Sequence, residues 1–463
     1  MYFRSEGKSV CADVIPYYEN GTFYLFYLKD FRDWENHGEG CPWCLLTTTD
    51  FVHYEDHGEV LPRGSQEDQD LYVFTGCCCK FNGEYYIFYT GHNPHKRACG
   101  LPEQKVLLAK SPDLFHWTKV TDFVLEAPNW LQIHDFRDPF VYWVEEKQCY
   151  YMLLAGRLIT DGAETAKGIT LRLRSVDLLN WEVEQEPFYA PNAFYTHECP
   201  DLFQMGDWWY LIFSEFSDKN ITTYRMAKSP EGPWITPKIN TFDGHAFYAA
   251  KSATDGQKRY LFGWNCIKNN EIDDAPWQWG GTIIPHELVQ AEDGTLYVKC
   301  PQAIQDSYDG LLWEAPSCTL GSNYGKEVQL FDSLPTQCKI EMDLTAEDDI
   351  GEFAILLNAD DQANSYYAAK WEPKYNRLAL DRHPRRDSTV HAQVDVERYC
   401  PITSGQSNHV LIIMEGSVAE VYVNDQVAMS IRMFDLPAGR LGLYAHNTKV
   451  RFDNIRVSIQ QNP

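Results

Sequence analysis

The feature that most constrains the fold is a phrase that occurs five times in the first 264 residues. Each copy is an aromatic, apolar strand entered through a tight turn, and the copies follow one another about every 50 to 65 residues. Strand repeats of this length are typical of β-propellers, in which each repeat forms one blade. The five copies are GTFYLFYL (21–28), GEYYIFYTG (83–91), CYYMLLAG (149–156), GDWWYLIFSE (206–215) and KRYLFGW (258–264).

A further strand precedes each copy and is joined to it by a hairpin turn, as at Asn20-Gly21 and Asn82-Gly83. In a propeller the first strand of every blade lies nearest the axis, so the opening residues of these strands converge. Asp13, Asp138 and Glu198 each stand at such an opening. The spacing therefore predicts that three carboxylates share one pocket.

The blade pattern stops at Pro301, and residues 302–325 resemble a connector with one helical turn. From residue 326 onward apolar and polar residues alternate in short runs such as KIEMDLT and HVLIIM, which is typical of half-buried strands. We therefore predict an all-β protein with a five-bladed β-propeller over 1–301, a linker over 302–325 and a β-sandwich over 326–463.

The charge of the chain excludes several partners. Its formal net charge is −26, from 66 acidic and 40 basic residues, which would repel nucleic acid and an anionic membrane surface. No stretch reaches the ~18 apolar residues that a membrane span needs, and the opening MYFRSEGKSVCADV lacks the apolar core of a signal peptide. We expect a cytoplasmic protein, and nothing in the pattern indicates an oligomeric state.

Fourteen cysteines would suit a disulfide framework in a secreted protein, but without an export signal reduced thiols are expected. Cys77, Cys78 and Cys79 are consecutive, and neighbouring strand residues point to opposite faces, so they cannot all be bridged. Cys41-Pro-Trp-Cys44 has the spacing of a metal motif, but no second such pair accompanies it. We predict no metal site and no cofactor.

Three carboxylates in one pocket suit the hydrolysis of a glycosidic bond. A covalent mechanism needs an ionised carboxylate as nucleophile and a protonated carboxyl as acid, roughly 5 Å apart. A third carboxylate can accept hydrogen bonds from the sugar hydroxyls, and Asp138, with Arg137 beside it to keep it ionised, fits that role. For any one acidic residue beside a proline, capping of a turn is the simpler interpretation. Three at equivalent positions favour a shared site.

Several motifs together resemble glycoside hydrolase family 32, which includes invertases, inulinases, levanases and related β-fructofuranosidases. They are Phe74-Thr75-Gly76, Arg137-Asp138-Pro139, Glu198-Cys199-Pro200, Trp43 seven positions before Asp50, and Trp279 ahead of Pro285-His286-Glu287-Leu288. The resemblance extends over nearly the whole chain, because RLGLYAHNTKVRFDNIRV is similar to the end of the family's C-terminal sandwich.

The resemblance implies that Asp13 is the nucleophile, Glu198 the acid/base and Asp138 the stabiliser of the transition state. It further implies that five residues shape the fructose subsite, namely Trp43, Phe74, Thr75, Arg137 and Trp279. The expected activity is the retaining release of fructose from short β-fructofuranosides, so the expected partner is a small oligosaccharide. For each aromatic residue, packing between blades is the competing interpretation.

Two departures from the family pattern indicate an altered fructose site. The family's nucleophile phrase is Asn-Asp-Pro-Asn-Gly, whereas this chain has Cys11-Ala12-Asp13-Val14-Ile15-Pro16. The family often carries Asp directly before Phe-Tyr-Ala, and this chain has Ala246 there. The side chains that normally contact the sugar beside the nucleophile are thus replaced.

Two other functions remain open at this point. An inverting enzyme of the family 43 type, acting on arabinosides or xylosides, places three carboxylates similarly but farther apart. A catalytically silent sugar-binding propeller is the other alternative. The C-terminal domain is either a carbohydrate-binding module or a stabilising wall, and the absence of an obvious exposed aromatic platform favours the wall.

Overall fold

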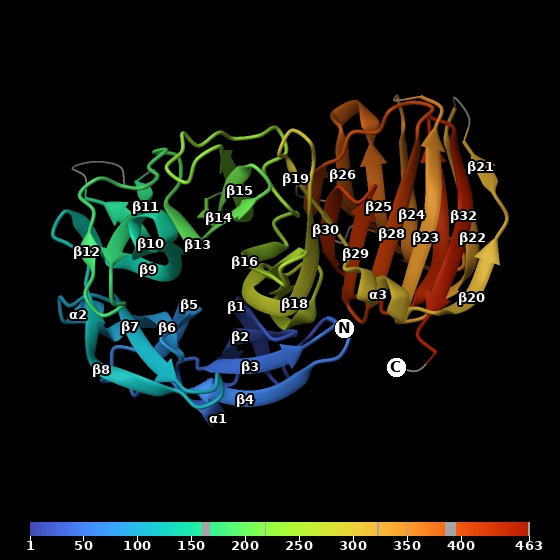
Figure 1. Ribbon diagram of the computed structural model, residues 1–463. Helices are drawn as coiled ribbons and strands as arrows, with labels where there is room; N and C mark the ends of the chain where they lie inside the picture. The colour runs from blue at the N-terminus through green and yellow to red at the C-terminus, as the bar shows by residue number, and fades with distance from the viewer. Residues whose placement is uncertain (160–166, 218, 322–323, 349, 385–394, 462–463) are drawn as a thin grey trace.

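The computed structural model describes residues 1–159, 167–217, 219–321, 324–348, 350–384 and 395–461. Two all-β bodies lie side by side, a ring of blades from the N-terminal part of the chain and a two-sheet sandwich from the C-terminal part (Figure 1). The predicted fold class is confirmed. The longest described helix has six residues, and none of the described helices could cross a membrane.

The ring consists of five antiparallel blades. The first contains β1 (Ser9–Glu19), β2 (Thr22–Phe31), β3 (Trp43–Thr48) and β4 (Glu55–Leu61). The second contains β5 (Tyr72–Phe81), β6 (Glu84–His92), β7 (Gln104–Ser111) and β8 (Thr118–Leu125). The third contains β9 (Leu131–Val144), β10 (Cys149–Leu158), β11 (Gly168–Ser175) and β12 (Glu182–Val183). The fourth contains β13 (Thr196–Met205), β14 (Trp208–Phe216) and β15 (Ile221–Ala227). The fifth contains β16 (Phe247–Thr254), β17 (Arg259–Lys268), β18 (Trp277–Gln290) and β19 (Leu296–Lys299).

The predicted hairpins are present. Asn20 and Gly21 have φ of 52° and 86°, and Asn82 and Gly83 have φ of 50° and 84°. Two successive positive φ values define the tight turn whose twist matches that of paired strands. Short helices occupy other connections: α1 (Trp34–His37), α2 (His95–Ala98), η1 (Glu145–Lys147) and η3 (Asn269–Glu271).

The ring closes by pairing of the first and fifth blades. β1 pairs with β18 antiparallel, with Cys11 opposite Gly281. A Cβ atom at Gly281 would lie 1.8 Å from the carbonyl oxygen of Asn265, so this position requires glycine. The closure ties the start of the chain, and Asp13 with it, to the end of the propeller.

The sandwich has one sheet in the order β20-β32-β23-β28-β29-β30, with β21 also paired to β32, and a second in the order β22-β31-β24-β25-β26-β27. Along β23 intermediate and buried residues alternate strictly, as the apolar and polar pattern predicts. The first sheet comprises β20 (Gly310–Ala315), β21 (Cys318–Leu320), β23 (Gln337–Ala346), β28 (Ser407–Glu415), β29 (Val418–Val423), β30 (Val427–Arg432) and β32 (Val450–Ile459). The second comprises β22 (Lys326–Leu334), β24 (Glu352–Ala359), β25 (Tyr366–Glu372), β26 (Arg377–His383), β27 (Val396–Tyr399) and β31 (Gly439–His446), with η4 (Pro373–Tyr375) between β25 and β26.

The connector is shorter than the predicted linker over 302–325. It contains α3 (Gln302–Ser307), but β20 and β21 already belong to the sandwich because both pair with β32. The sandwich sheet therefore begins at Gly310. The boundaries at 301 and 326 stay a prediction about how the chain divides into domains.

Candidate active site

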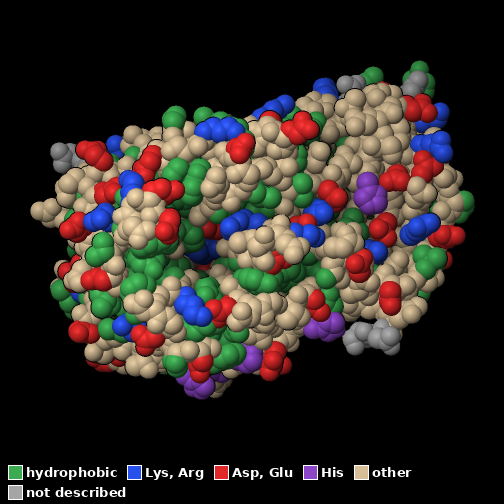
Figure 2. Space-filling view, viewed as in Figure 1, with side chains coloured by type: hydrophobic (Ala, Val, Ile, Leu, Met, Phe, Trp, Pro, Cys, Tyr) green, Lys and Arg blue, Asp and Glu red, His purple; other side chains and the backbone are tan. Residues whose placement is uncertain are grey.

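A cavity of about 1320 Å³ lies at the axis of the propeller and reaches the sandwich. On the face seen in Figure 2 the surface is hollowed, and Lys and Arg side chains gather around the hollow. Seven of the eight predicted site residues line the cavity: Asp13, Phe74, Thr75, Arg137, Asp138, Glu198 and Trp279.

A β-bulge in the innermost strand of every blade positions this site. In each of these strands the pairing with the next strand slips by one residue at the same level, at Asp13, Thr75, Asp138, Cys199 and Ala249. Three of the five have a positive φ without being glycine: 62° at Asp138, 52° at Cys199 and 53° at Ala249. Such strain costs ~1–3 kcal/mol per residue and is typical of functional sites. The bulges turn side chains from all five blades into the cavity.

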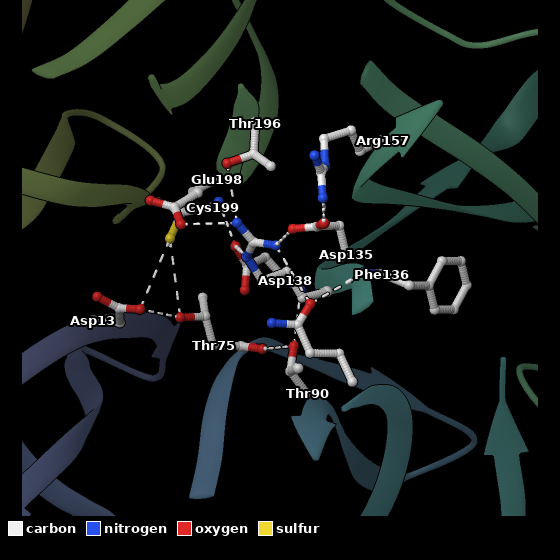
Figure 3. Close-up of polar contacts among 12 residues, drawn as sticks. Asp13, Thr75, Thr90, Asp135, Phe136, Asp138, Arg157, Thr196, Glu198 and Cys199 are labelled. Atoms are coloured by element: carbon white, nitrogen blue, oxygen red, sulfur yellow. Dashed lines mark hydrogen bonds and ion pairs between the residues drawn. The ribbon is translucent and has the colours of Figure 1, made fainter. Parts of the chain in front are cut away.

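Asp13 is held from three sides. The Thr75 hydroxyl and the Trp264 indole donate to its two carboxylate oxygens, the latter at 2.9 Å, and the Cys199 thiol lies 4.0 Å from Oδ2 (Figure 3). Burial raises the pKa of Asp13 above its usual range, opposed by the hydrogen bonds from Thr75 and Trp264. The carboxylate is thus oriented by donors that stabilise its charged form.

Asp138 is more deeply buried than Asp13, so its ionised form is more costly to bury. Its backbone N–H donates to the Thr90 hydroxyl at 2.8 Å, and its Oδ2 accepts from the Cys199 backbone N–H at 2.9 Å. Burial, reinforced by the charge of Glu198, raises the pKa of Asp138 to about 7. Arg137 lowers the pKa of Asp138, in the expected direction, but it only partly offsets the effects of burial and of Glu198.

Arg137 instead binds the two carboxylates on its other sides. Its guanidinium donates to Glu198 Oε1 at 2.9 Å and to Asp135 Oδ1 at 3.0 Å, whereas the nearest oxygen of Asp138 is 3.7 Å away. The Tyr248 hydroxyl donates to the second oxygen of Glu198 at 2.5 Å. Glu198 is thus held by a charged donor and a neutral donor at once.

The buried charge of Asp138 gives a testable consequence for stability. We expect Asp138→Asn to raise the melting temperature at pH 8 by about 2 to 6 °C and to change it little at pH 4. In the folded protein the carboxyl holds its proton up to about pH 7, whereas the ordinary value is 3.8, so its contribution to stability is lost as the pH rises between these values. Thermal melts at both pH values measure the difference.

An aspartate with the opposite shift provides the control for this prediction. Hydrogen bonds from Asn180 lower the pKa of Asp177, in an outer turn, to about 2. Its charge stabilises the fold above its ordinary pKa, so Asp177→Asn should lower the melting temperature at pH 8. If Asp138→Asn also lowered it at pH 8, the buried charge would not be a source of instability.

Aromatic rings form one side of the cavity. The Phe74 ring is stacked on His92, with centroids 4.7 Å apart, and lies 6.0 Å from the Trp279 ring. Trp264 lies 6.1 Å from Trp279 on the other side. Trp279 remains 36% exposed, which is high for a residue of its size and leaves a ring face for a ligand.

Trp43 is not brought to the cavity, and its assignment to the subsite is not supported. Its side chain is fully buried and packs against the rings of Phe26 and Tyr89, at centroid distances of 6.0 and 6.3 Å. Because β3 is the third strand of its blade, its side chains pack between blades. Packing, the competing interpretation, accounts for Trp43.

Within the described part of the chain, one group of His, Asp and Glu side chains is compact enough to hold an ion: Asp243, His286 and Glu420. None of the three lines the cavity. The Ser430 hydroxyl bridges Asp243 and Glu420 at 2.9 and 2.7 Å, and burial beside Asp243 raises the pKa of Glu420 well above its usual range. Hydrogen bonds through Ser430 join Asp243 and Glu420 in a buried junction between the two domains.

We therefore keep the prediction that activity needs no metal. A chelator such as EDTA should leave the turnover rate unchanged, because side chains alone can supply the nucleophile, the acid and the stabilising carboxylate. Loss of activity in EDTA that Ca²⁺ or Zn²⁺ restored would show that an essential ion site exists.

A five-bladed propeller whose innermost strands direct three carboxylates into one cavity is the arrangement of a glycosidase. Residues 15–301 match the glycosyl hydrolases family 32 N-terminal domain, and residues 317–459 match the family 32 C-terminal domain. The chain belongs to glycosyl hydrolase family 32. It is a glycosidase similar to the β-fructofuranosidases, which decides against the family 43 alternative and against a silent sugar-binding propeller.

Individual relatives agree with this assignment. Sucrose-6-phosphate hydrolase of Escherichia coli is 25% identical over 449 residues, which cover 92% of this chain and 87% of that protein. Among solved structures, exo-inulinase from Aspergillus awamori superimposes with a TM-score of 0.75 at 19% identity, covering 99% of this chain and 97% of the other. Sucrose-6-phosphate hydrolase from Lactobacillus gasseri gives a TM-score of 0.72 at 20% identity, covering 98% and 91%. The two structures show that the fold is shared.

Three contacts of the site were not among the predicted residues: Trp264 and Cys199 beside Asp13, and Tyr248 on Glu198. Tyr248 lies in the Phe-Tyr-Ala phrase that follows Ala246, and Trp264 ends the fifth aromatic copy. The equivalence of the fifth blade with the other four is the sequence signal that places both residues at the cavity. Cys199 stands in the Glu198-Cys199-Pro200 motif, but nothing in the motif predicts its contact with Asp13.

Proposed function

We propose that this protein is a retaining glycoside hydrolase that releases fructose from short β-fructofuranosides by double displacement. Asp13 is the nucleophile, Glu198 the general acid and base, and Asp138 the carboxylate that binds the fructose hydroxyls. Phe74, Thr75, Arg137 and Trp279 shape the fructose subsite. The observation that carries the proposal is the convergence on one cavity of Asp13 and Asp138, which lie at bulges, and of Glu198, which directly precedes one.

In the first step Asp13 attacks the anomeric carbon of fructose while Glu198 gives its proton to the leaving oxygen. The bond to the leaving group breaks, and a fructosyl ester forms on Asp13. Thr75 and Trp264 support this role, since they orient the Asp13 carboxylate. In the second step Glu198 takes a proton from water. The water oxygen attacks the anomeric carbon from the face that the leaving group had occupied and displaces Asp13.

The groups around Glu198 suit its role as the general base. Arg137 and Tyr248 each donate to one carboxylate oxygen of Glu198, which stabilises the ionised form present after the first step. Burial raises the pKa of Tyr248 well above its usual range, so this hydroxyl keeps its proton and remains a donor throughout. Asp138 can accept hydrogen bonds from the sugar, which strengthen as positive charge develops on the ring.

The cavity and the altered phrase at Asp13 both bear on substrate choice. Pockets for compact ligands usually occupy about 300–1,000 Å³, so a cavity of 1320 Å³ has room for a fructose unit and further sugars. The relatives are named for sucrose 6-phosphate and for inulin, which differ in length. Because Ala12, Ile15 and Ala246 replace polar residues of the family pattern, we propose short fructo-oligosaccharides as better substrates than sucrose.

Kinetics on a substrate series test this choice. We expect kcat/KM to be higher for inulin- or levan-type oligosaccharides of about two to four sugars than for sucrose and for polymeric inulin, since the cavity encloses only a few units. Faster release of fructose from the polymer, from sucrose or from sucrose 6-phosphate than from every short oligosaccharide would contradict the proposal. Preferential release of arabinose or xylose would contradict the fructoside specificity altogether.

We also propose a reducing, cytoplasmic location, in which the substrate is a short sugar taken up by the cell. All fourteen cysteines are free thiols, and ten of them are buried. Free thiols in this number suit a reducing compartment.

A further inference from the structure

The sandwich contributes four charged side chains to the cavity. They are Lys370 and Glu372 on β25, Arg377 on β26 and Glu397 on β27. Side-chain exposure rises from 13% at Glu372 to 30% at Arg377 and 53% at Glu397. The side chain of Asp138 is 5% exposed and that of Glu198 is 21% exposed. Arg377 and Glu397 are thus more exposed than Asp138 and Glu198, which suits a place near the mouth of the cavity, facing the part of the substrate beyond fructose.

These sandwich side chains are fixed by one another. The Arg377 guanidinium lies between two carboxylates, donating through Nε to Glu372 and through Nη1 to Glu397, both at 2.8 Å. Lys370 donates to Asp381 at 2.8 Å. Charge-assisted contacts of this kind orient both partners. Glu372 and Glu397 each accept from Arg377 through Oε2, and an ionised carboxylate has about four acceptor positions, so both can still accept from sugar hydroxyls.

The strand that carries Glu397 is anchored to the propeller. Arg398 donates to the carbonyl oxygens of Asp243 at 2.7 Å and Thr241 at 3.0 Å, and it is buried. Val396 packs so closely on Gly244 that a Cβ there would lie 2.5 Å from Val396 Cγ1. Because side chains alternate along a strand, Glu397 points away from these two contacts. The wall and the catalytic floor are therefore held at a fixed spacing.

The propeller supplies a complementary aromatic side. Trp277 and Trp279 both line the cavity, and Trp277 is held by an edge contact with His245 at 5.6 Å and by Lys268 over its ring at 4.5 Å. A sugar has apolar ring faces and polar edges, so a cavity lined by both aromatic rings and charged groups matches its chemistry. The same wall suits an uncharged sugar better than a phosphorylated one, because Glu372 and Glu397 flank the Arg377 cation.

We propose that the sandwich of the same chain forms the outer wall of the substrate site, where Glu372, Arg377 and Glu397 bind the second and third sugars of the substrate. This inference rests on the proposed function and deepens it. The sandwich then selects substrate length, beyond the stabilising role expected of it. Fructosides with one or two further uncharged sugars gain contacts that a fructoside with a small leaving group cannot make.

The test compares a fructosyl trisaccharide, 1-kestose, with methyl β-D-fructofuranoside as substrates of the full chain. We expect Glu397→Gln and Arg377→Met each to lower the ratio of kcat/KM for kestose over the methyl fructoside about tenfold, mainly through KM for kestose. Arg451→Met is the matched control, because Arg451 pairs with Asp453 at 2.9 Å in the same sandwich but does not line the cavity. Its ratio should equal that of the wild type.

The results distinguish failure of the proposed sandwich wall from failure of the proposed hydrolase function. A wild-type ratio in Glu397→Gln, with an unchanged melting temperature, would overturn the wall while leaving the hydrolase intact. Glu397→Gln decides the question alone if Arg377→Met does not fold, because the amide keeps the size of the carboxylate and its side chain is half exposed. Failure of the wild type to release fructose from either substrate would overturn the proposed function itself.

Discussion

Asp13→Asn is expected to reduce kcat by at least about a thousandfold on every fructoside, because an amide cannot form the covalent fructosyl ester. The fold should survive, since the amide oxygen can still accept from the Trp264 indole and the Thr75 hydroxyl can rotate to accept from the amide NH2. Burial raises the pKa of the Asp13 carboxyl, so loss of the charge should not lower the melting temperature. Steady-state kinetics and a thermal melt of the same preparation measure both effects.

Asp70→Asn is the matched control for this variant. Asp70 is a buried aspartate of the propeller that accepts a hydrogen bond from Tyr89 at 2.9 Å, and it does not line the cavity. Its kcat should stay close to that of the wild type. If Asp13→Asn kept more than a tenth of wild-type turnover on the best substrate, Asp13 would not be the nucleophile.

Glu198→Gln is expected to cost about as much on natural substrates but far less on an aryl fructoside. A sugar leaving group needs a proton from the acid, whereas a nitrophenolate leaves without one. The variant should then accumulate the fructosyl enzyme, and azide should speed its breakdown because azide attacks without a general base. A comparison of kcat on kestose and on a nitrophenyl fructoside, with and without azide, shows the pattern.

Glu287→Gln controls for the loss of a buried glutamate in the propeller. Glu287 is buried, pairs with Lys258 at 3.0 Å and lies outside the cavity. This variant should hydrolyse both substrates at nearly the wild-type rate. An equal loss on both substrates in Glu198→Gln, without azide rescue, would be incompatible with Glu198 as the acid and base.

Much of this fold could be predicted from the sequence because blade strands leave a local signature. The aromatic copies and their hairpins depend on strand pairing between neighbours in the chain, which turn residues such as Asn20-Gly21 specify. Asp13, Asp138 and Glu198 could be placed together since each opens an equivalent strand. The pairing of β20 and β21 with β32 joins segments more than a hundred residues apart, and the local pattern around Gly310 does not announce such a contact.

The contacts within the site were harder to predict. Each bulge depends on register with the next strand, which tertiary packing sets and no single residue announces. Arg137 stands next to Asp138 in the chain, yet its guanidinium donates to Glu198 of the next blade. Trp43 has the spacing of the family pattern but lies on the third strand of its blade, where side chains pack between blades.

The proposed mechanism requires that fructose is transferred to Asp13 during turnover, and mass spectrometry detects this intermediate directly. The Glu198→Gln variant is mixed with a nitrophenyl fructoside, quenched in acid, and analysed intact and as peptides. If Asp13 is the nucleophile, the protein should gain the mass of one fructosyl unit, located on Asp13 and absent after treatment with azide. An unmodified protein during active release of nitrophenol, or a fructosyl group on a residue other than Asp13, would contradict it.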